Sequence, residues 1–547
     1  MSSANGRQDL SALGIQDLSA LGIQALVDPG KTPTDEQVRV IEAPRRPLLV
    51  VAGAGSGKTE TMSMRVLWLV ANHEDIAPSS VLGLTFTRKA AGELGDRLRQ
   101  RLALLARRVP SLRERLDEDP VSLTYNSFAE RIVAEHGMRI GIDPDFTMLT
   151  EAGAVDLMTQ IVEGWPTDLD EDLSPSAAVG HCLHLAGEVG EHGYTVEEAR
   201  DALEGFGRDL EQIGATNDTA RKTLRANARR LAYLGPVEEF QRRKREGGLL
   251  DFSDQLVLAT RIVCGAPAVS AQVRDEFQAV LLDEFQDTSV IQMELLSLLF
   301  HDHAVTAVGD PNQAIYGWRG ASASSLERFL DRFQDGPARP GQTLTLSTAW
   351  RNDRNILRAA NRVAAPLREH SRTAKSPVLR ARPGAGEGRV DVAYTQDYRS
   401  ALGAVVDFVS AHRSRGTREG KRPTTAVLCR RRSDFPYVDM ALREAGVPTQ
   451  IVGLGGLLDQ PSVQDARAAL VLADDVEASP WLARLLAGID LGAADLVALG
   501  DWARHLAREE GRDPHRAVLL DAVDNPPEPG WSASGGARGR PAISGEA

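Results

Sequence analysis

The chain has 547 residues, of which 42% are apolar and 25% charged, and its formal net charge at pH 7 is −13. This length exceeds what one hydrophobic core supports, so we expect several domains. The sequence has neither an apolar run long enough to span a membrane nor the N-terminal pattern of a signal peptide, which predicts a cytoplasmic protein without a membrane partner. The negative charge argues against extensive nucleic-acid contacts but leaves room for a local basic groove.

The N-terminal residues 1–30 contain the sequence Asp-Leu-Ser-Ala-Leu-Gly-Ile-Gln twice in tandem, at 9–16 and 17–24. Two copies of eight residues are too few for a solenoid. We therefore expect a short amphipathic lead, to which we assign no function, and a folded part that begins at residue 31.

A glycine-rich loop follows the apolar run 48–52 and precedes apolar residues at helical spacing. The residues of this segment are Ala52, Gly53, Ala54, Gly55, Ser56, Gly57, Lys58 and Thr59. A strand, a glycine loop and a helix in this order predict a phosphate-binding loop for ATP. In such a loop Lys58 reaches the β and γ phosphates and Thr59 binds Mg²⁺. Ala52 stands where the usual pattern has glycine.

The residues Thr34-Asp35-Glu36-Gln37 have the pattern of a helix capping box, in which Thr34 caps the helix and Gln37 reaches back. The alternative is that the Gln37 amide pairs with the edge of an adenine ring, as amides do when they read adenine. Taken alone, the local pattern favours the cap.

A second candidate for the nucleotide site is the apolar run 279–282, which ends in Asp283 and Glu284. A strand that ends in two acids suits the position opposite a phosphate loop, where Asp283 binds the magnesium ion and Glu284 polarises the attacking water. The alternative is a strand whose solvent end is acidic by chance.

Two later apolar runs end in polar and aromatic side chains. Gln313 is a candidate sensor of the γ phosphate, and Trp318 either stacks on a base or covers a seam between domains. Arg351 is a candidate cation for charge that develops during phosphoryl transfer, and Trp350 is a candidate to stack on adenine.

The segment 121–128 carries Tyr125 among hydroxyl and amide side chains. An aromatic residue in this setting suits single-stranded nucleic acid, but a core aromatic suits it as well. From 129 to 250 the pattern is helical and contains no motif chemistry, which predicts a helical insertion.

In their order along the chain, these segments resemble the UvrD/Rep/PcrA family of superfamily 1 DNA helicases, from about Thr34 to Asp475. The resemblance implies that Gln37 reads adenine, that ATP and Mg²⁺ are the cofactors, and that the partners are single-stranded DNA and DNA with a 3′ single-stranded tail. The residues implied to contact DNA are Thr85, Phe86, Arg88, Tyr125, Asn126, Trp318 and Arg319. Two of them depart from the family pattern, since relatives commonly carry His at the position of Asn126 and Asn at that of Arg88.

The wording of several motifs, such as Thr-Arg-Lys-Ala-Ala, is similar to the actinobacterial branch, which includes subunits of the AdnAB helicase-nuclease. This implies a second helicase or nuclease subunit as a candidate partner. The family's late segments Thr-x-His-x-x-Lys-Gly-Leu-Glu and Tyr-Val-x-x-Thr-Arg-Ala are not found, so we expect a C-terminal truncation that impairs unwinding. The alternative to a 3′–5′ helicase of DNA repair or recombination is an ATP- and DNA-binding module without motor activity.

The predicted fold class is α/β, with a RecA-like P-loop parallel sheet domain, a helical insertion and an incomplete second RecA-like domain. The expected ranges are 1–30 for the lead, 31–128 and 251–345 for the first RecA-like domain, 129–250 for the insertion, 346–478 for the partial second domain, 479–524 for the start of a further helical insertion and 525–547 for a disordered tail.

Overall fold

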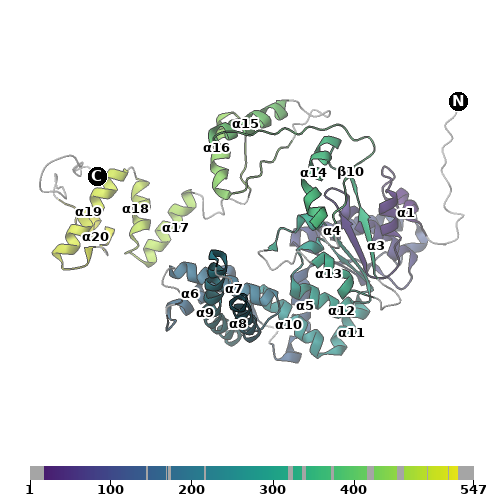
Figure 1. The fold of residues 1–547 in the computed structure, drawn as a ribbon, viewed down its shortest axis with the longest axis horizontal. Coiled ribbons are helices and arrows are strands. Elements are labelled where there is room, and N and C mark those ends of the chain that lie inside the picture. Colours follow the sequence, from purple (N-terminus) through teal and green to yellow (C-terminus); the bar gives the residue numbers. More distant parts are fainter. Residues whose placement is uncertain are drawn as a thin grey trace. The chain divides into compact units, whose positions relative to one another are not determined.

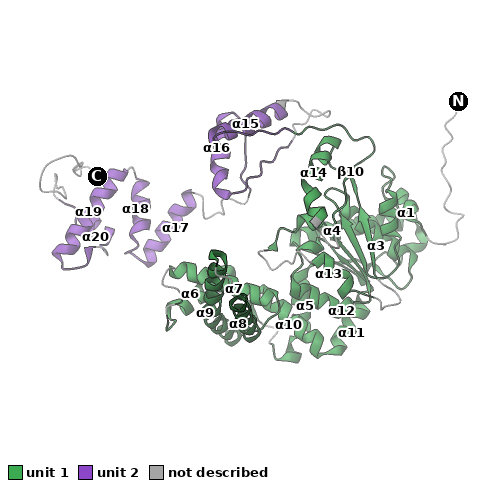
Figure 2. Cartoon of the chain, viewed as in Figure 1, with its two compact units in different colours: residues 1–390 green, residues 391–547 purple. Residues whose placement is uncertain are grey.

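The computed structural model divides the chain into two compact units, residues 1–390 and 391–547 (Figure 2). The residues that the structure describes are 18–142, 146–167, 169, 174–214, 217–317, 325–334, 341–370, 375–414, 424–452, 461–489, 491–514 and 517–527.

A six-stranded parallel sheet in the order β3-β2-β6-β7-β1-β8 forms the centre of unit 1 (Figure 1). Its strands are β1 (Leu48–Ala52), β2 (Val81–Thr85), β3 (Val121–Thr124), β6 (Ala279–Leu282), β7 (Ala304–Gly309) and β8 (Gln342–Leu346). This sheet confirms the predicted α/β fold. Because all its strands are parallel, the carboxyl ends of β1 and β6 lie at the same edge, with β7 between them.

Helices cover both faces of this sheet, and alternate strand residues point into the two cores. One core receives Leu48 and Val50 from β1, and the other receives Leu49 and Val51. The first face carries α1 (Ala20–Val27), α2 (Asp35–Ile41), α3 (Lys58–Asn72) and α4 (Arg88–Arg108). The second carries α5 (Tyr125–His136), α10 (Phe252–Gly265), α11 (Pro267–Glu276), α12 (Val290–Phe300) and α13 (Ser325–Arg332).

The folded part begins earlier than predicted, because α1 comes from the second octapeptide copy. Ala20 and Ile23 are fully buried against the sheet helices. The backbone of Leu18 exchanges two hydrogen bonds with the Asn72 amide at the end of α3, with lengths of 2.7 and 2.9 Å. Residues 1–17, which hold the first copy, lie outside the described residues.

The helical insertion has a core of its own, built by α6 (Glu151–Glu163), α7 (Pro175–Glu191), α8 (Val196–Gln212) and α9 (Asp218–Glu246). A short parallel pair, β4 (Thr147–Met148) with β5 (Leu249–Leu250), joins its two ends. The predicted range 129–250 starts too early, because α5 packs its apolar residues Ala129, Ile132 and Val133 against the sheet.

The elements after β8 also differ from the expected domain boundary at residue 346. The short strand β9 (Thr348–Ala349) pairs with β10 (Arg380–Ala381), and both belong to unit 1 together with α14 (Arg354–His370). Unit 1 therefore extends to Val390.

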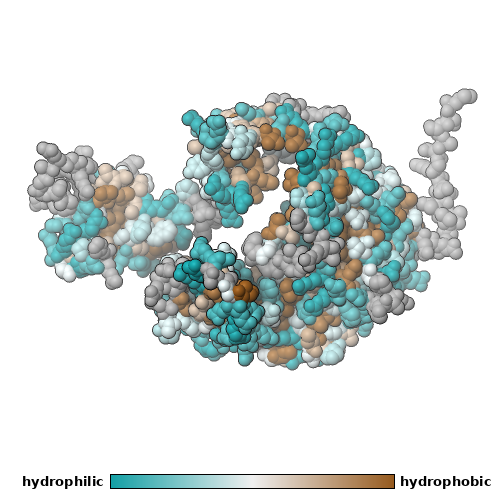
Figure 3. All heavy atoms as spheres, in the orientation of Figure 1, coloured by the Kyte–Doolittle hydropathy of each residue, from teal (hydrophilic) through white to brown (hydrophobic). Residues whose placement is uncertain are grey.

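Unit 2 consists of helices and irregular segments, and its described residues contain no strand. Its helices are α15 (Tyr398–Ser414), α16 (Phe435–Glu444), α17 (Pro461–Asp474), α18 (Ser479–Ala487), α19 (Ala493–Glu509) and α20 (Leu519–Asp524). The apolar run 426–429, inside the range expected for the second RecA-like domain, forms no strand, and Leu428 is 93% exposed. Apolar atoms reach the surface around α15 and α16 (Figure 3). The second RecA-like domain therefore stays a prediction.

Among the described residues, no single helix is long and apolar enough to cross a membrane. The sharply bent pair α10 and α11 meets that criterion only when both helices are counted together.

Candidate nucleotide and DNA-contact site

The loop between β1 and α3 adopts the backbone of an anion-binding loop. Gly55 and Gly57 have φ angles of +73° and +83°, in the left-handed region that favours glycine. The Ser56 hydroxyl is buried and has no hydrogen-bond partner among the described residues. Helix α3 starts at Lys58 without a side-chain cap, so its first N–H groups remain available. These features fit a bound phosphate chain.

Trp350 and Arg351, which follow β9, lie directly against this loop. The Trp350 N–H donates to the Gly55 carbonyl at 2.8 Å. A Cβ at Gly55 would lie 3.0 Å from the Arg351 Cβ, and one at Gly57 would lie 3.7 Å from Trp350 Cδ1. The structure thus brings both residues to the phosphate loop, with the indole 38% exposed.

Gln37 forms the predicted cap of α2, and its side chain also lies beside the phosphate loop. The capping box forms, since the Gln37 N–H donates to Thr34 Oγ1 at 3.3 Å and the Thr34 N–H donates to Gln37 Oε1 at 2.9 Å. The amide nitrogen Nε2 lies 3.1 Å from where a Cβ at Gly57 would stand. The side chain therefore caps α2 and also reaches the loop beside Trp350.

The two acids after β6 lie across from the loop. Lys58 Nζ donates to Glu284 Oε2 at 2.7 Å, and Gln286 Nε2 donates to the same oxygen at 2.9 Å. Glu284 has a φ of 49°, the one positive φ of a non-glycine residue in the described part of the chain. Such a backbone is unfavourable by roughly 1–3 kcal/mol and persists where the surroundings hold it. Here it directs the carboxylate at the P-loop lysine.

Asp283 is 8% exposed, and burial together with the neighbouring Glu284 charge raises the pKa of its carboxyl to about 6. Thr59 and Asp283 line one cleft with a volume of about 440 Å³. Within the described residues, no cluster of three or more His, Cys, Asp or Glu side chains could hold a metal ion. A Mg²⁺ ion would therefore depend on Thr59, Asp283 and nucleotide phosphates, which is the coordination that this ion favours.

Gln313 joins this site through a residue that sequence reasoning missed. Its Nε2 donates to Asp310 Oδ2 at 2.7 Å, and the Asp310 N–H donates to Gln286 Oε1 at 3.0 Å. Asp310 is 3% exposed. A continuous set of contacts thus runs from Glu284 through Gln286 and Asp310 to Gln313. The signal in the sequence was an acid placed directly after β7.

Phe86, one of the implied DNA contacts, stacks on Tyr316 with ring centroids 4.7 Å apart and an interplanar angle of 23°. Both rings line the cleft that contains Thr59 and Asp283. Tyr316 was also missed, although it lies two residues before Trp318, which was singled out. The aromatic pair and the candidate catalytic acids therefore share one cleft.

Two of the implied DNA contacts, Thr85 and Tyr125, are buried in this structure. Thr85 is 1% exposed and its hydroxyl donates to the Thr87 carbonyl at 3.2 Å, so it shapes the turn before α4. Tyr125 is 3% exposed and its hydroxyl donates to the Asp283 carbonyl at 3.0 Å. For Tyr125, the core alternative is the one that the structure supports, because the ring packs between the sheet and α5.

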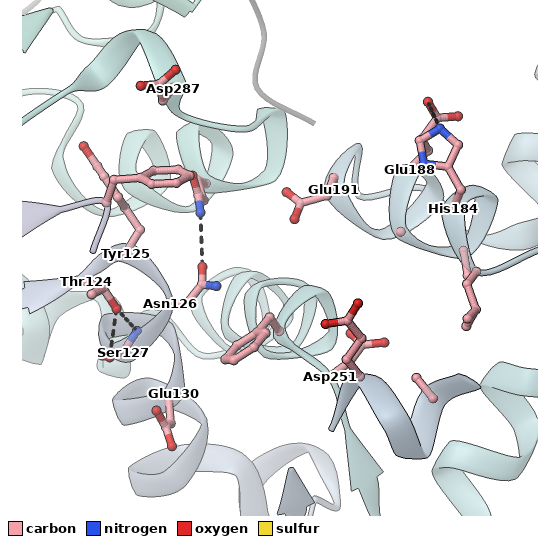
Figure 4. A pocket seen from close by; sticks show the side chains of 18 of the residues that line it. Thr124, Tyr125, Asn126, Ser127, Glu130, His184, Glu188, Glu191, Asp251 and Asp287 are labelled. Carbon is pink, nitrogen blue, oxygen red and sulfur yellow. Dashed lines mark hydrogen bonds and ion pairs between the residues drawn. The ribbon is translucent and has the colours of Figure 1, made fainter. Parts of the chain in front are cut away.

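The other implied DNA contacts have different surroundings. Arg88 is exposed at the start of α4. Asn126 accepts a hydrogen bond from Gln292 Nε2 at 3.1 Å (Figure 4). Trp318 and Arg319 lie outside the described residues.

A larger pocket of about 880 Å³ lies between the sheet helices and the insertion. Figure 4 shows carboxylates entering it from both sides, with Asp287 on one side and Glu191 on the other. Its acidic lining residues are Glu130, Glu151, Glu188, Glu191, Asp251 and Asp287. Because nucleic-acid backbones need cationic partners, the interior of this pocket does not suit a DNA strand.

A parallel sheet with a glycine loop after β1 and paired acids after β6 is the arrangement of a RecA-like P-loop domain. The sequence profile of the UvrD/REP helicase N-terminal domain matches residues 33–334, which is more than half of the chain. The chain belongs to the UvrD/REP helicase family.

Individual relatives agree with this assignment. The chain is 28% identical over 441 residues to DNA helicase II of Escherichia coli, which covers 80% of the chain and 54% of the relative. It is 26% identical over 436 residues to ATP-dependent DNA helicase PcrA of Staphylococcus epidermidis, covering 80% and 53%. It is 29% identical over 500 residues to ATP-dependent DNA helicase UvrD2 of Mycobacterium tuberculosis, covering 90% and 64%. The chain thus spans between about half and two thirds of the length of these relatives.

Proposed function

We propose that this chain is an ATP-dependent translocase and helicase that moves 3′ to 5′ on single-stranded DNA in repair or recombination. The observation that carries the proposal is the shared cleft, in which Thr59, Asp283 and Glu284 lie with the stacked rings of Phe86 and Tyr316. A site for hydrolysis and a platform for bases are therefore adjacent.

The residues around the phosphate loop fit ATP, which would supply the phosphoryl group when bound, and Mg²⁺, which would neutralise charge on the phosphates. Gln37 and Trp350 flank the loop where the adenine ring would lie. Lys58 would exchange Glu284 for phosphate oxygens, because both are anionic partners within its reach. The Glu284 carboxylate, released from the lysine, would then accept a proton from the attacking water. Arg351 would neutralise the developing charge.

On the DNA side, Phe86 and Tyr316 would present a stacking face to bases. Gln313 is connected to Glu284 through Asp310 and Gln286, so a change at the phosphates has a physical route to the segment that carries Tyr316. We also propose contacts to DNA from Arg88, Asn126, Trp318 and Arg319, on the resemblance alone.

Four finer features of the proposed function are carried over from the sequence alone. They are a substrate with a 3′ single-stranded tail, a place in the actinobacterial branch near the AdnAB subunits, a second helicase or nuclease subunit as partner, and a cytoplasmic location.

A second candidate function is an ATP- and DNA-binding module without motor activity. It is favoured by unit 2, whose described residues contain no strand and leave Leu428 exposed where a motor domain would bury it. A module of this kind would bind both ligands without coupling them.

Steady-state ATP hydrolysis with and without a single-stranded oligonucleotide tests the proposal. We expect strong stimulation by DNA, and Glu284→Gln should lower the stimulated rate by about 10²-fold or more because the proton acceptor is lost. ATP binding with low turnover in the presence of DNA would support the second candidate. An ATP hydrolysis rate that is the same with and without DNA would contradict both candidate functions.

A further inference from the structure

Arg65, in the middle of α3, is a fully buried arginine whose hydrogen-bond partners in the described part of the chain are all neutral. Its exposed fraction is 0%. Nε donates to the Thr306 hydroxyl at 2.8 Å, and the two terminal nitrogens donate to backbone carbonyls at 2.9–3.2 Å. Burying a guanidinium without a carboxylate is costly, and burial lowers its pKa to about 10, so it remains charged at neutral pH. The unfavourable burial of this guanidinium indicates that Arg65 has a specific role.

The carbonyls that Arg65 binds belong to the last turn of α2 and the residues just after it. They are those of Val40, Ile41, Ala43 and Pro44. Helix α2 has seven residues, which is too short to be stable alone. A buried cation at its C-terminal end satisfies the free carbonyls and complements the negative end of the helix dipole. Arg65 therefore anchors α2 to the helix that begins with Lys58.

The other end of α2 is anchored by Glu36. Its two carboxylate oxygens accept hydrogen bonds from the Ser347 N–H and the Ser347 hydroxyl, each at 2.7 Å. Ser347 follows β8 and precedes Trp350 by three residues. Glu36 thus ties α2 to the segment that carries the exposed indole.

Gln37 lies between these two anchors. Its amide nitrogen is 3.1 Å from a Cβ position at Gly57, and Trp350 is 3.7 Å from the same point. The distance between amide and indole across the loop is therefore set by where α2 sits, and α2 sits where Arg65 and Glu36 hold it.

We propose that Arg65 and Glu36 are positioning residues that hold α2 in place so that the Gln37 amide discriminates adenine from other bases. This inference rests on the proposed function, since it requires that ATP binds beside Gly57. Neither residue touches the nucleotide; both act through the placement of Gln37.

The test is equilibrium binding of fluorescent ATP and GTP analogues and of inorganic tripolyphosphate by the full chain. The variants are Arg65→Met, Glu36→Ala and the control Arg115→Met, whose guanidinium donates to the carbonyls of Val70 and His73 at the C-terminal end of α3, away from α2. In Arg65→Met and Glu36→Ala, we expect the preference for ATP over GTP to fall about 10-fold, the scale of one lost hydrogen bond. Tripolyphosphate affinity should change by less than about twofold, and the control should keep the preference.

A purely structural role would weaken all three ligands alike, and that result would overturn the inference. So would an unchanged preference in Glu36→Ala, which decides the matter if Arg65→Met does not fold. Equal binding of ATP and GTP by the unaltered chain would also overturn it, while leaving the ATP site in place. Failure of the unaltered chain to bind any of the three ligands would instead contradict the proposed function.

Discussion

The acidic pocket beside the insertion and the cleft beside the phosphate loop, both in unit 1, differ in size and in the chemistry of their walls. The larger, of about 880 Å³, is lined by six carboxylates and offers Arg88 and His184 as basic groups. The smaller, of about 440 Å³, joins a phosphate loop, a strained acid and an aromatic pair. Volume alone points to the first pocket, but an anionic nucleotide or a DNA strand would be repelled there. The arrangement of charge and hydrogen bonds favours the second pocket as the proposed nucleotide site.

Two residues line both pockets and show where they meet. Phe86 stacks on Tyr316, and Asp287 Oδ2 accepts a hydrogen bond from Gln286 Nε2 at 3.1 Å. The wall between the pockets therefore carries the proposed base platform, and substitutions on either side of it separate the two sites.

The largest expected effect is that of Lys58→Ala in the smaller cleft. Removing the amine leaves the phosphates without their cation and leaves Glu284 without its partner, so ATP turnover should fall by about 10³-fold. DNA affinity should stay nearly intact, because the lysine lies on the nucleotide side. Steady-state turnover and oligonucleotide binding measure both. Lys31→Ala, at an exposed lysine of the same unit, is the matched control. Unchanged turnover in Lys58→Ala would remove the site assignment.

Asp283 should make the stability of the nucleotide-free protein depend on pH. The pKa of the Asp283 carboxyl is raised from 3.8 to about 6. Between these two pH values the carboxyl is therefore protonated in the folded protein and ionised in the unfolded chain. The contribution of Asp283 to the free energy of unfolding is fully present below pH 4 and is lost as the pH rises through 6, by up to about 3 kcal/mol. Asp283→Asn should lack this loss, so its advantage over the unaltered chain should grow between pH 4.5 and 7.5. Urea unfolding in the presence of a chelator checks this, and a constant difference across that range would contradict it.

Phe86→Ala should weaken the binding of single-stranded DNA by the free energy of one stacking contact, on the order of 1–3 kcal/mol. Fluorescence anisotropy with a labelled oligonucleotide measures the loss. Tyr316→Ala should cause a similar loss, and the double variant should lose less than the sum because the two rings stack on each other. Additive losses would show that the rings act independently.

The smallest effect is expected in the larger pocket. The double variant Glu188→Gln and Glu191→Gln keeps the shape of both side chains on α7 while removing two charges. ATP turnover and oligonucleotide affinity should each change by less than about threefold, because neither residue lines the smaller cleft. A marked gain in DNA affinity would mean that the strand passes through this pocket.

The sequence predicted those parts of the site that depend on local backbone chemistry. The strand, glycine loop and helix around Lys58 form as expected, and so does the capping box at Gln37. Each is encoded within a few neighbouring residues, where turn and capping preferences act directly.

Other parts depended on contacts between distant segments. Tyr125 suits a base or a core equally by residue type, and only the position of α5 against the sheet buries it. Arg65 sits in an amphipathic helix pattern that does not reveal the carbonyls that it binds 21–25 residues earlier. The octapeptide repeat predicts only a short N-terminal amphipathic segment, yet the apolar face of its second copy packs on α3 and α4. In each case tertiary packing decided what local pattern left open.

The most direct test of the central claim, that the smaller cleft and its loop hold ATP, is photoaffinity labelling with 8-azido-ATP in the presence of Mg²⁺, followed by mapping of the labelled peptides. The account predicts labels in the peptides that contain Gln37 or Trp350, with loss of labelling when unmodified ATP is in excess. Competable labels in the insertion helices between Glu151 and Glu246, around the larger pocket, would contradict it.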